Sequence, residues 1–457
     1  MKSYLIVGAL LLVIIALLAT NKKLVETVKN IFKIEDLRKR LIYTCLLILV
    51  YRLGCYVVIP GIDPNLLGEG SALANQMNSN GLLGLLNVFS GGAFANAAIF
   101  ALGVMPYITA SIIIQLLGMM VPAVQKMMKE GESGRRKMNQ WTRLLTIGVL
   151  ALQGPAYVAN LYHQMPEAFV YGNAFIFTVY ATIILIAGTM FVVWLGEKIT
   201  DKGIGNGVSL IIMIGIIARF PQALIQEFTS RMTGAAGGGV IMFLFEIVLL
   251  ILVICAGVAL LRGTRKIPVQ YAKQATGGAA VAGARQYLPL KVNAANVMPI
   301  IFAQAIMFIP MAIMGYGAKG EPSAFVQLMS DHTSWLYNLI FALLIILFTY
   351  FYTAITINPV QMAEDMKRNN GFIPGIKPGK PTAEYIDMVM SRITLPGSLF
   401  LAVVAILPAF AGIFGVQQEF AQFFGGTSLL ILVGVVLDTL QQIESYLLMR
   451  HYDGLLK

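Results

Sequence analysis

Charged residues are scarce in this sequence: they make up 12% of its 457 residues, whereas 58% are hydrophobic. A soluble protein of this length could not cover its surface with so few charges. The composition therefore excludes a water-soluble globular protein and indicates a chain that spans a membrane.

Residue types used in catalysis are also few. The three cysteines, Cys45, Cys55 and Cys255, lie in or near apolar stretches without a Cys-x-x-Cys spacing, and we interpret them as small buried apolar side chains. The three histidines lie in loops or at the tail. Because no zinc-protease, serine-hydrolase or phosphate-loop motif is present in the sequence, we predict no enzyme, no metal site and no cofactor.

Apolar stretches of helical length, by contrast, are abundant. About 20 apolar residues cross roughly 30 Å of hydrocarbon at 1.5 Å per residue, and a helix satisfies its own backbone groups within such a stretch. We predict an all-α polytopic membrane protein with ten transmembrane helices. The spans are 41–59, 98–120, 144–162, 174–195, 207–225, 240–261, 294–315, 335–357, 393–414 and 427–449.

Positive charge alternates from one loop to the next. The segments on one side of the predicted spans hold 28 Lys and Arg, and those on the other side hold 3. By the positive-inside rule, both ends of the ten-span core face the cytoplasm, together with large basic loops at 262–293 and 358–392. Such loops are either docking structures or merely solvated, and the residues alone leave both readings open.

Three segments outside the spans need separate interpretations. For the apolar residues 1–23, an extra helix, a wrongly chosen start and an added segment all stay open. Residues 24–40 have the spacing of an amphipathic helix on the cytoplasmic membrane surface, with a solvated helix as the alternative. Residues 81–98 are glycine-rich and apolar, which favours a short re-entrant helix buried in the bundle over an interfacial loop.

One proline-bearing apolar stretch occurs twice. Residues 103–115 (GVMPYITASIIIQ) and 296–308 (NVMPIIFAQAIMF) are identical at 6 of 13 aligned positions. They fall in the second and seventh predicted spans, which cross the membrane in opposite directions. We therefore predict two inverted five-helix halves, 41–230 and 231–457, related by a pseudo-two-fold axis in the membrane plane.

Inverted halves also occur in ion-coupled secondary transporters, which need charged residues within the membrane. The deep charges in this chain are few: Glu246 and Asp438, with Arg52 and Glu197 nearer the span ends. A secondary transporter and a purely structural scaffold both stay open as readings of these residues.

Several longer motifs, in order along the chain, resemble the SecY family of bacterial protein-conducting channel subunits from about residue 24 onward. They include IPGID (59–63), FSGGAF (89–94), WLGEKITDKGIGNGVSLII (194–212), GFIPGIKPGKPTAEYID (371–387) and GGTSLLILVGVVLDTLQQIESYLLMRHYDG (425–454). The resemblance implies two halves hinged at the loop between spans five and six. It also implies a channel in the bacterial cytoplasmic membrane that passes unfolded secretory polypeptides and releases apolar segments sideways into lipid.

The same resemblance assigns residues to parts of the channel. The pore ring would be Val104, Ile108, Val208, Ile212, Ile301 and Ile431. The lateral gate between spans two and seven would include Pro106, Thr109, Ser111, Gln115, Pro299 and Gln304. A re-entrant plug at about 81–97 would include Leu82, Leu83, Leu85, Leu86, Phe89, Gly91 and Gly92. We expect the two gate prolines to weaken their helices, and the four polar gate residues to hydrogen-bond across the closed seam.

The implied partners are the SecE and SecG subunits, the motor ATPase SecA, the ribosome with its RNA, unfolded preproteins and nascent chains, and membrane lipid. Arg265, Lys266 and Lys377 in the two basic loops are the expected contacts with SecA or the ribosome, because acidic protein surfaces and RNA favour basic partners. Lys377 stands where many relatives carry Arg, and it keeps the charge without the bidentate donor geometry.

Overall fold

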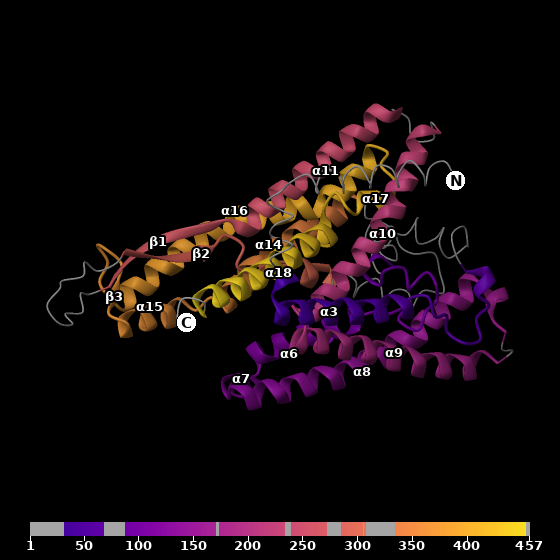
Figure 1. The fold of residues 1–457 in the computed structure, drawn as a ribbon, viewed down its shortest axis with the longest axis horizontal. Helices are drawn as coiled ribbons and strands as arrows, with labels where there is room; N and C mark the ends of the chain where they lie inside the picture. Colours follow the sequence, from indigo (N-terminus) through magenta and orange to yellow (C-terminus); the bar gives the residue numbers. More distant parts are fainter. Residues whose placement is uncertain are drawn as a thin grey trace. The chain divides into compact units, whose positions relative to one another are not determined.

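In a computed structural model of the chain, the described residues are 32–67, 87–170, 173–233, 239–271, 285–304, 306–307 and 334–453. They are mainly helical and form two compact units (Figure 1). Unit 1 takes the residues up to 244 together with 415–423 and 435–457, and unit 2 takes 245–414 and 424–434. The division of the chain into halves near residue 230 stays a prediction.

Unit 1 consists of long apolar helices and short connections. Its helices are α3 (Glu35–Gly54), α6 (Met105–Met120), α7 (Pro122–Lys129), α8 (Glu132–Gln164), α9 (Ala174–Lys202), α10 (Gly207–Met232), α17 (Gln418–Ala421) and the second part of α18 (Gly426–Asp453). α8 and α9 have 33 and 29 residues and pack against each other. At 1.5 Å per residue, both helices exceed the thickness of the hydrocarbon layer.

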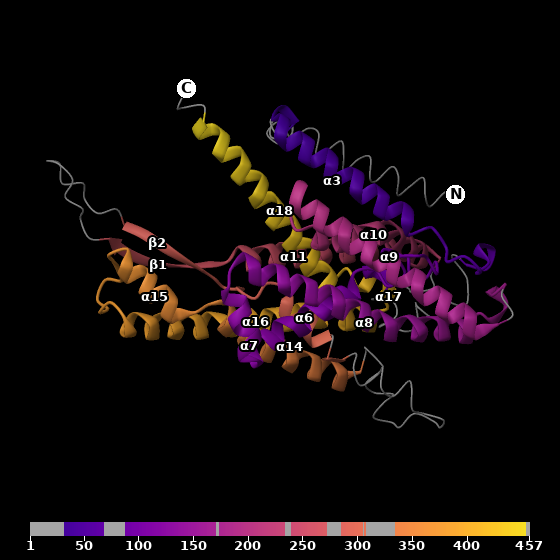
Figure 2. The same cartoon turned by 90° about the horizontal axis from the view of Figure 1, so that it is seen from below.

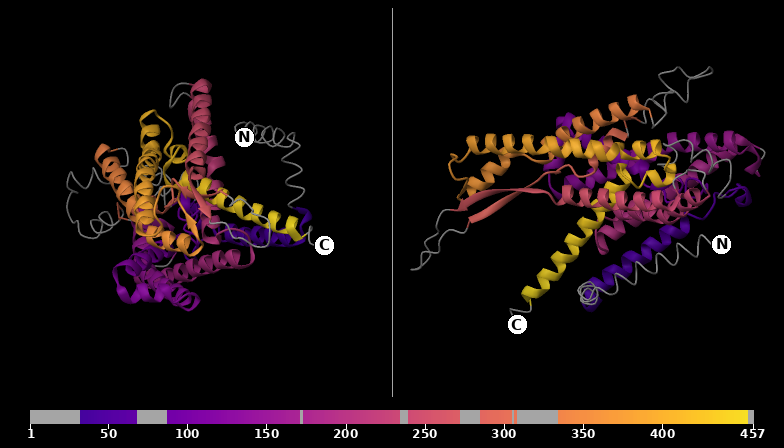
Figure 3. Two further views of the ribbon diagram at one scale, coloured as in Figure 1. Left: turned by 90° about the vertical axis from the view of Figure 1, so that its left-hand side faces the viewer. Right: turned by 90° about the horizontal axis from the view of Figure 1, so that it is seen from above.

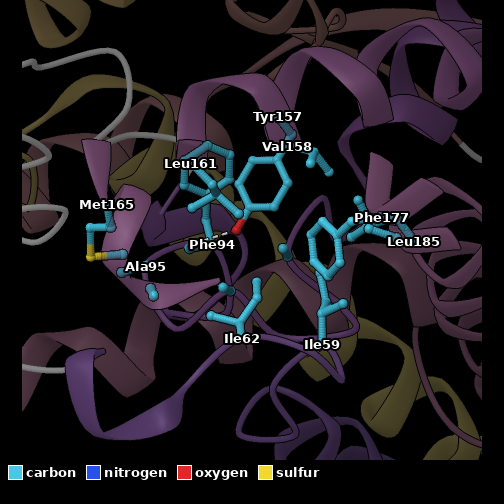
Figure 4. Close-up of a cluster of buried hydrophobic side chains, with 14 residues drawn as sticks. Ile59, Ile62, Phe94, Ala95, Tyr157, Val158, Leu161, Met165, Phe177 and Leu185 are labelled. Atoms are coloured by element: carbon cyan, nitrogen blue, oxygen red, sulfur yellow. Dashed lines mark hydrogen bonds between the residues drawn. The ribbon is translucent and has the colours of Figure 1, made fainter. Parts of the chain in front are cut away.

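A buried cluster joins the end of α8 and the beginning of α9 to the irregular segments at 59–62 and 94–101 (Figure 4). The rings of Phe94 and Tyr157 lie 4.7 Å apart between centroids. The Tyr157 hydroxyl donates to the carbonyl of Phe94 at 2.8 Å. Irregular backbone is stable at this place because it is enclosed by protein and hydrogen-bonded.

Unit 2 combines helices with a small sheet. Its elements are α11 (Gly239–Arg262, from Phe245), β1 (Thr264–Tyr271), β2 (Arg285–Lys291), a helix from Met298, α14 (Trp335–Thr356), α15 (Pro359–Arg368), β3 (Gly371–Phe372), α16 (Lys380–Ile413) and the first part of α18. α14, α16, the helix from Met298 and α18 share one apolar core. The strands and α15 lie together at one end of this unit (Figures 2 and 3). These strands were not predicted from the sequence.

Each of the ten predicted spans contains described helical residues. Among the described residues, seven helices are long and apolar enough to cross a membrane, and α6 provides a shorter apolar helix. The predicted span 98–120 begins too early, because Ile99 donates its N–H to the carbonyl of Val57 and residues 99–104 form turns.

The cysteines differ from the expectation that all three are buried. Cys55 is buried, whereas Cys45 and Cys255 are exposed. The expectation was wrong for these two because a membrane protein can turn small apolar side chains outward toward lipid.

Candidate functional site

The duplicated Val-Met-Pro motif is the beginning of a helix in both copies. α6 begins at Met105, and the helix carrying the second copy begins at Met298. Pro106 and Pro299 therefore occupy the second helical position, where a backbone N–H has no partner within the helix. The expectation that these prolines weaken their helices was wrong, since at this position proline favours the start of a helix.

Four predicted ring residues lie in unit 1, at the N-terminal ends of two helices. The carbonyl of Val104 accepts the N–H of Ile108 at 3.1 Å in the first turn of α6. Val208 and Ile212 lie one turn apart in α10, and the side chain of Asn206 caps this helix. Val104 and Ile212 are buried, and the other two are half-buried.

The turn that leads into α10 is held by two other helices of unit 1. The Thr44 hydroxyl of α3 accepts the N–H of Ile204 at 3.2 Å. The Gln442 side chain of α18 accepts the N–H of Gly205 at 2.8 Å. These two hydrogen bonds were not predicted from the sequence, because both partners lie more than 150 residues from the turn.

The remaining two ring residues lie on neighbouring elements of unit 2. Ile301 belongs to the first turn of the helix from Met298, and Ile431 belongs to the first part of α18. A Cβ added to Gly434 would lie 3.6 Å from the side chain of Val297, so these two helices pack closely. Ile431 is buried and Ile301 is half-buried.

The predicted plug is described only in part. Phe89, Gly91 and Gly92 are buried. Four other predicted plug residues lie outside the described residues: Leu82, Leu83, Leu85 and Leu86. The burial of 87–95 is what is expected of a segment that enters the bundle rather than lying at its surface.

Hydrogen bonds give the described part of the plug a fixed shape. The side-chain oxygen of Asn87 accepts the N–H of Ala95, and the hydroxyl of Ser90 accepts the N–H of Phe94, both at 3.1 Å. Tyr157 of α8 then holds the Phe94 carbonyl (Figure 4). The segment is thus tied to unit 1 at its second half.

The polar gate residues of α6 make hydrogen bonds along their own helix. Thr109 donates to the carbonyl of Met105 at 3.1 Å, and Gln115 donates to the hydroxyl of Ser111 at 3.4 Å. Gln304, on the helix from Met298, is half-buried. Hydrogen bonding across a closed seam stays a prediction.

The two basic loops of unit 2 join into one small folded structure. β1 pairs with β2 in antiparallel register and also with β3, which comes from the other loop. The second pairing aligns Gln270 with Phe372. One face of the sheet, with α15 and the start of α16, encloses a core that includes Ile267, Val269 and Ile373. We name this structure the platform; it consists of β1, β2, β3, α15 and the first turns of α16.

The three predicted contact cations are brought onto this platform. Arg265 and Lys266 lie on β1, and Lys377 lies in the loop that follows β3. All three are exposed. The hydroxyl of Thr382 donates to the carbonyl of Lys377 at 2.9 Å, which fixes the loop against the start of α16. The platform therefore carries all three cations, although Lys377 lies more than 100 residues after the other two in sequence.

The four charges that lie in or near the predicted spans have different environments in the structure. Glu197 of α9 forms an ion pair with Arg143 of α8, and Arg52 donates to the carbonyl of Gly91. Glu246 is buried and Asp438 is exposed. Two of the four are thus engaged in holding elements of unit 1 together.

The fold is similar to that of solved protein channels. One structure of a protein-conducting channel matches with a TM-score of 0.61 and 18% identity, over 89% of this chain and 92% of that one. A second, from a study of the SecY plug domain, has a TM-score of 0.59. The predicted fold of ten transmembrane helices is confirmed, and the small sheet of unit 2 is an addition to the predicted all-α architecture.

Sequence comparison identifies the family. A SecY family model matches residues 98–440. The chain is 43% identical to the protein translocase subunit SecY of Streptomyces scabiei, over 93% of this chain and 98% of that protein. It is 44% identical to that of Halalkalibacterium halodurans, over 94% of this chain and 100% of that protein. The chain therefore belongs to the SecY family of protein translocase subunits.

Proposed function

We propose that this chain forms the protein-conducting channel of a bacterial translocase and passes unfolded polypeptides across, and apolar segments into, the cytoplasmic membrane. The observation that carries the proposal is 43% identity to a translocase subunit along 93% of the chain. A secondary transporter, which the residues alone left open, finds no support among these relatives. An unfolded chain needs a channel because each unpaired backbone group in hydrocarbon costs several kcal/mol.

The six ring residues would form the constriction of this channel. All are branched aliphatic side chains, which can close around a passing polypeptide and exclude water from an idle pore. Residues 81–97 would add a plug. In a related protein the plug domain is described as stabilising the closed state and maintaining a membrane seal. The chain itself performs no chemistry in this proposal.

The platform would be the docking surface for the ribosome and SecA, with SecE and SecG as companion subunits. Its exposed Arg265, Lys266 and Lys377 suit the negative charge of RNA and of acidic proteins. A similar solved structure, with a TM-score of 0.54, comes from a canine ribosome-channel complex. The alternation of Lys and Arg between loops supports a cytoplasmic position for the platform and for both ends of the ten-span core.

Replacing Gln115 and Gln304 together with leucine should lower the hydrophobicity that a segment needs to leave the channel for lipid. Each Leu, Ile, Phe or Val at the centre of a segment gains roughly 0.3–0.6 kcal/mol on transfer into lipid. Summed over about 20 residues, this gain can offset the free energy needed to separate the two gate helices. A seam without these amides should part more easily. Membrane insertion of a graded leucine–alanine series measures the threshold, and Gln361→Leu on the exposed face of α15 is the control. An unchanged threshold would count against the gate assignment.

Crosslinking of a trapped polypeptide tests the channel directly. With the native cysteines replaced, single cysteines at Ile108 and Ile301 should each crosslink to a secretory chain stalled in transit. A cysteine at Leu144, which is 76% exposed on α8, should not crosslink. A stalled chain that reaches neither ring position would refute the proposed path.

A further inference from the structure

The turn at 89–92 has a backbone conformation that favours glycine. Gly91 and Gly92 have φ values of 65° and 92°, in the left-handed region. The carbonyl of Ser90 accepts the hydroxyl of the buried Tyr51 at 3.3 Å. The turn is therefore well defined and attached to α3.

Gly215 of α10 lets this turn approach the helix backbone. A Cβ added to Gly215 would lie 2.8 Å from the carbonyl oxygen of Phe89 and 3.2 Å from the nitrogen of Gly91. A Cβ added to Gly91 would in turn lie 3.0 Å from the Cα of Gly215. Because backbone meets backbone here, no flexible side chain can move aside when Gly215 is enlarged.

Gly215 also belongs to the helix face that carries two predicted ring residues. Val208, Ile212, Gly215 and Arg219 follow one another at spacings of four, three and four, which places them along one face of α10. The Nε of Arg219 lies 3.2 Å from the position of a Cβ on Gly92. The contact with the turn is thus a continuation of the ring face.

Arg52 of α3 holds the same turn through a charged donor. Its Nη1 donates to the carbonyl of Gly91 at 2.9 Å, and its Nη2 donates to the hydroxyl of Tyr56 at 3.3 Å. Hydrogen bonds from guanidinium are stronger than those from neutral donors. Because Arg52 is only half-buried, water can replace the Gly91 carbonyl without leaving a buried unpaired charge. The bond is therefore both strong and exchangeable.

We propose that Gly215 and Arg52 are positioning residues that seat the 89–92 turn in the idle channel and so hold the plug closed. This inference rests on the proposed function, in which residues 81–97 seal the pore. During translocation the turn leaves Gly215, and Arg52 exchanges the Gly91 carbonyl for water. The second half of the segment stays attached through Tyr157.

We call Gly215 and Arg52 together the seat of this turn. The ion conductance of the idle channel, reconstituted with its companion subunits in planar bilayers, tests whether the seat holds the plug closed. Gly215→Ala and Arg52→Gln should both raise it, by about tenfold for Arg52→Gln, as expected for one lost charged hydrogen bond. Arg52→Lys, which keeps the charge and a donor, should restore most of the seal. Gly148→Ala on α8 is the matched control, because beyond its chain neighbours and its own helix backbone no atom lies within 4 Å of the added Cβ.

A deletion of residues 81–86 distinguishes a failure of the proposed seat from a failure of the plug assignment. The deletion should itself raise conductance, and the seat variants should add nothing to it. If the deletion raises conductance but the variants of the intact chain do not, the seat is refuted while the plug stands. Equal effects of the variants with and without the deletion would also refute the seat. If the deletion changes nothing, the plug assignment fails, and the seat fails with it. Gly215→Ala and Arg52→Lys keep the test decisive if Arg52→Gln does not fold.

Discussion

Replacing Glu227 with alanine should lower the free energy of unfolding by about 3–5 kcal/mol, the usual effect of breaking a buried ion pair. Thermal unfolding of the purified protein measures this as a lower Tm, together with a lower yield of folded chain. The sequence offers no sign of the effect, since Glu227 lies near the end of a span where exposed charges are common.

The structure supplies the reason. Glu227 and Arg231 lie one turn apart on α10, with an Nε–Oε1 distance of 2.8 Å and exposed side-chain fractions of 0% and 2%. The second carboxylate oxygen of Glu227 accepts the N–H of Gln417 at 2.8 Å, and the Gln417 amide donates to Ser230 at 3.0 Å. Alanine at position 227 would leave a buried guanidinium without its carboxylate and this backbone N–H without its acceptor.

An ion pair with the same spacing provides the control. Glu132 and Arg136 of α8 are 2.9 Å apart, but their side chains are 82% and 78% exposed. Glu132→Ala should leave Tm unchanged, because solvent screens the exposed pair. Glu227→Gln should have an intermediate effect, since its amide oxygen can still accept from Gln417. Equal shifts in Tm for Glu227→Ala and Glu132→Ala would contradict the argument.

Reversing the three platform cations together, Arg265→Glu, Lys266→Glu and Lys377→Glu, should reduce ATPase-driven translocation by at least about tenfold. All three side chains are exposed on one folded structure, so the fold should survive while the charge presented to a partner changes sign. Translocation into membrane vesicles and cosedimentation with ribosomes at low and high salt measure the two partnerships. The loss of ribosome binding should be most visible at low salt, where charge contributes most.

A triple charge reversal outside the platform distinguishes a loss of docking from the effect of a changed net charge. Lys126, Arg136 and Lys137 lie between the second and third predicted spans, and their reversal changes the charge of the chain by the same amount. This variant should translocate better than the platform variant. Full activity of the platform variant, or equal losses in both, would remove the three cations from the docking surface.

The membrane spans could be predicted because hydrophobicity adds up along a segment without reference to its neighbours. The Val-Met-Pro repeat likewise marked two related helices, and both copies begin a helix at the methionine. The effect of the prolines was mispredicted, because a helix boundary depends on where the preceding backbone finds its hydrogen bonds. For α6 these partners include Val57, more than 40 residues earlier.

By itself the sequence determined that this chain crosses a membrane as apolar helices, since the length of an apolar run is matched directly to the thickness of hydrocarbon. Only the tertiary structure decided which polar groups meet: Arg143 with Glu197, Gln417 with Glu227, and the strand of one basic loop with that of the other. The physical reason is that the two kinds of interaction differ in how much of the surrounding structure they depend on. Transfer into lipid depends on each residue separately, whereas a hydrogen bond requires two atoms to be placed within a few tenths of an ångström by the packing of everything around them.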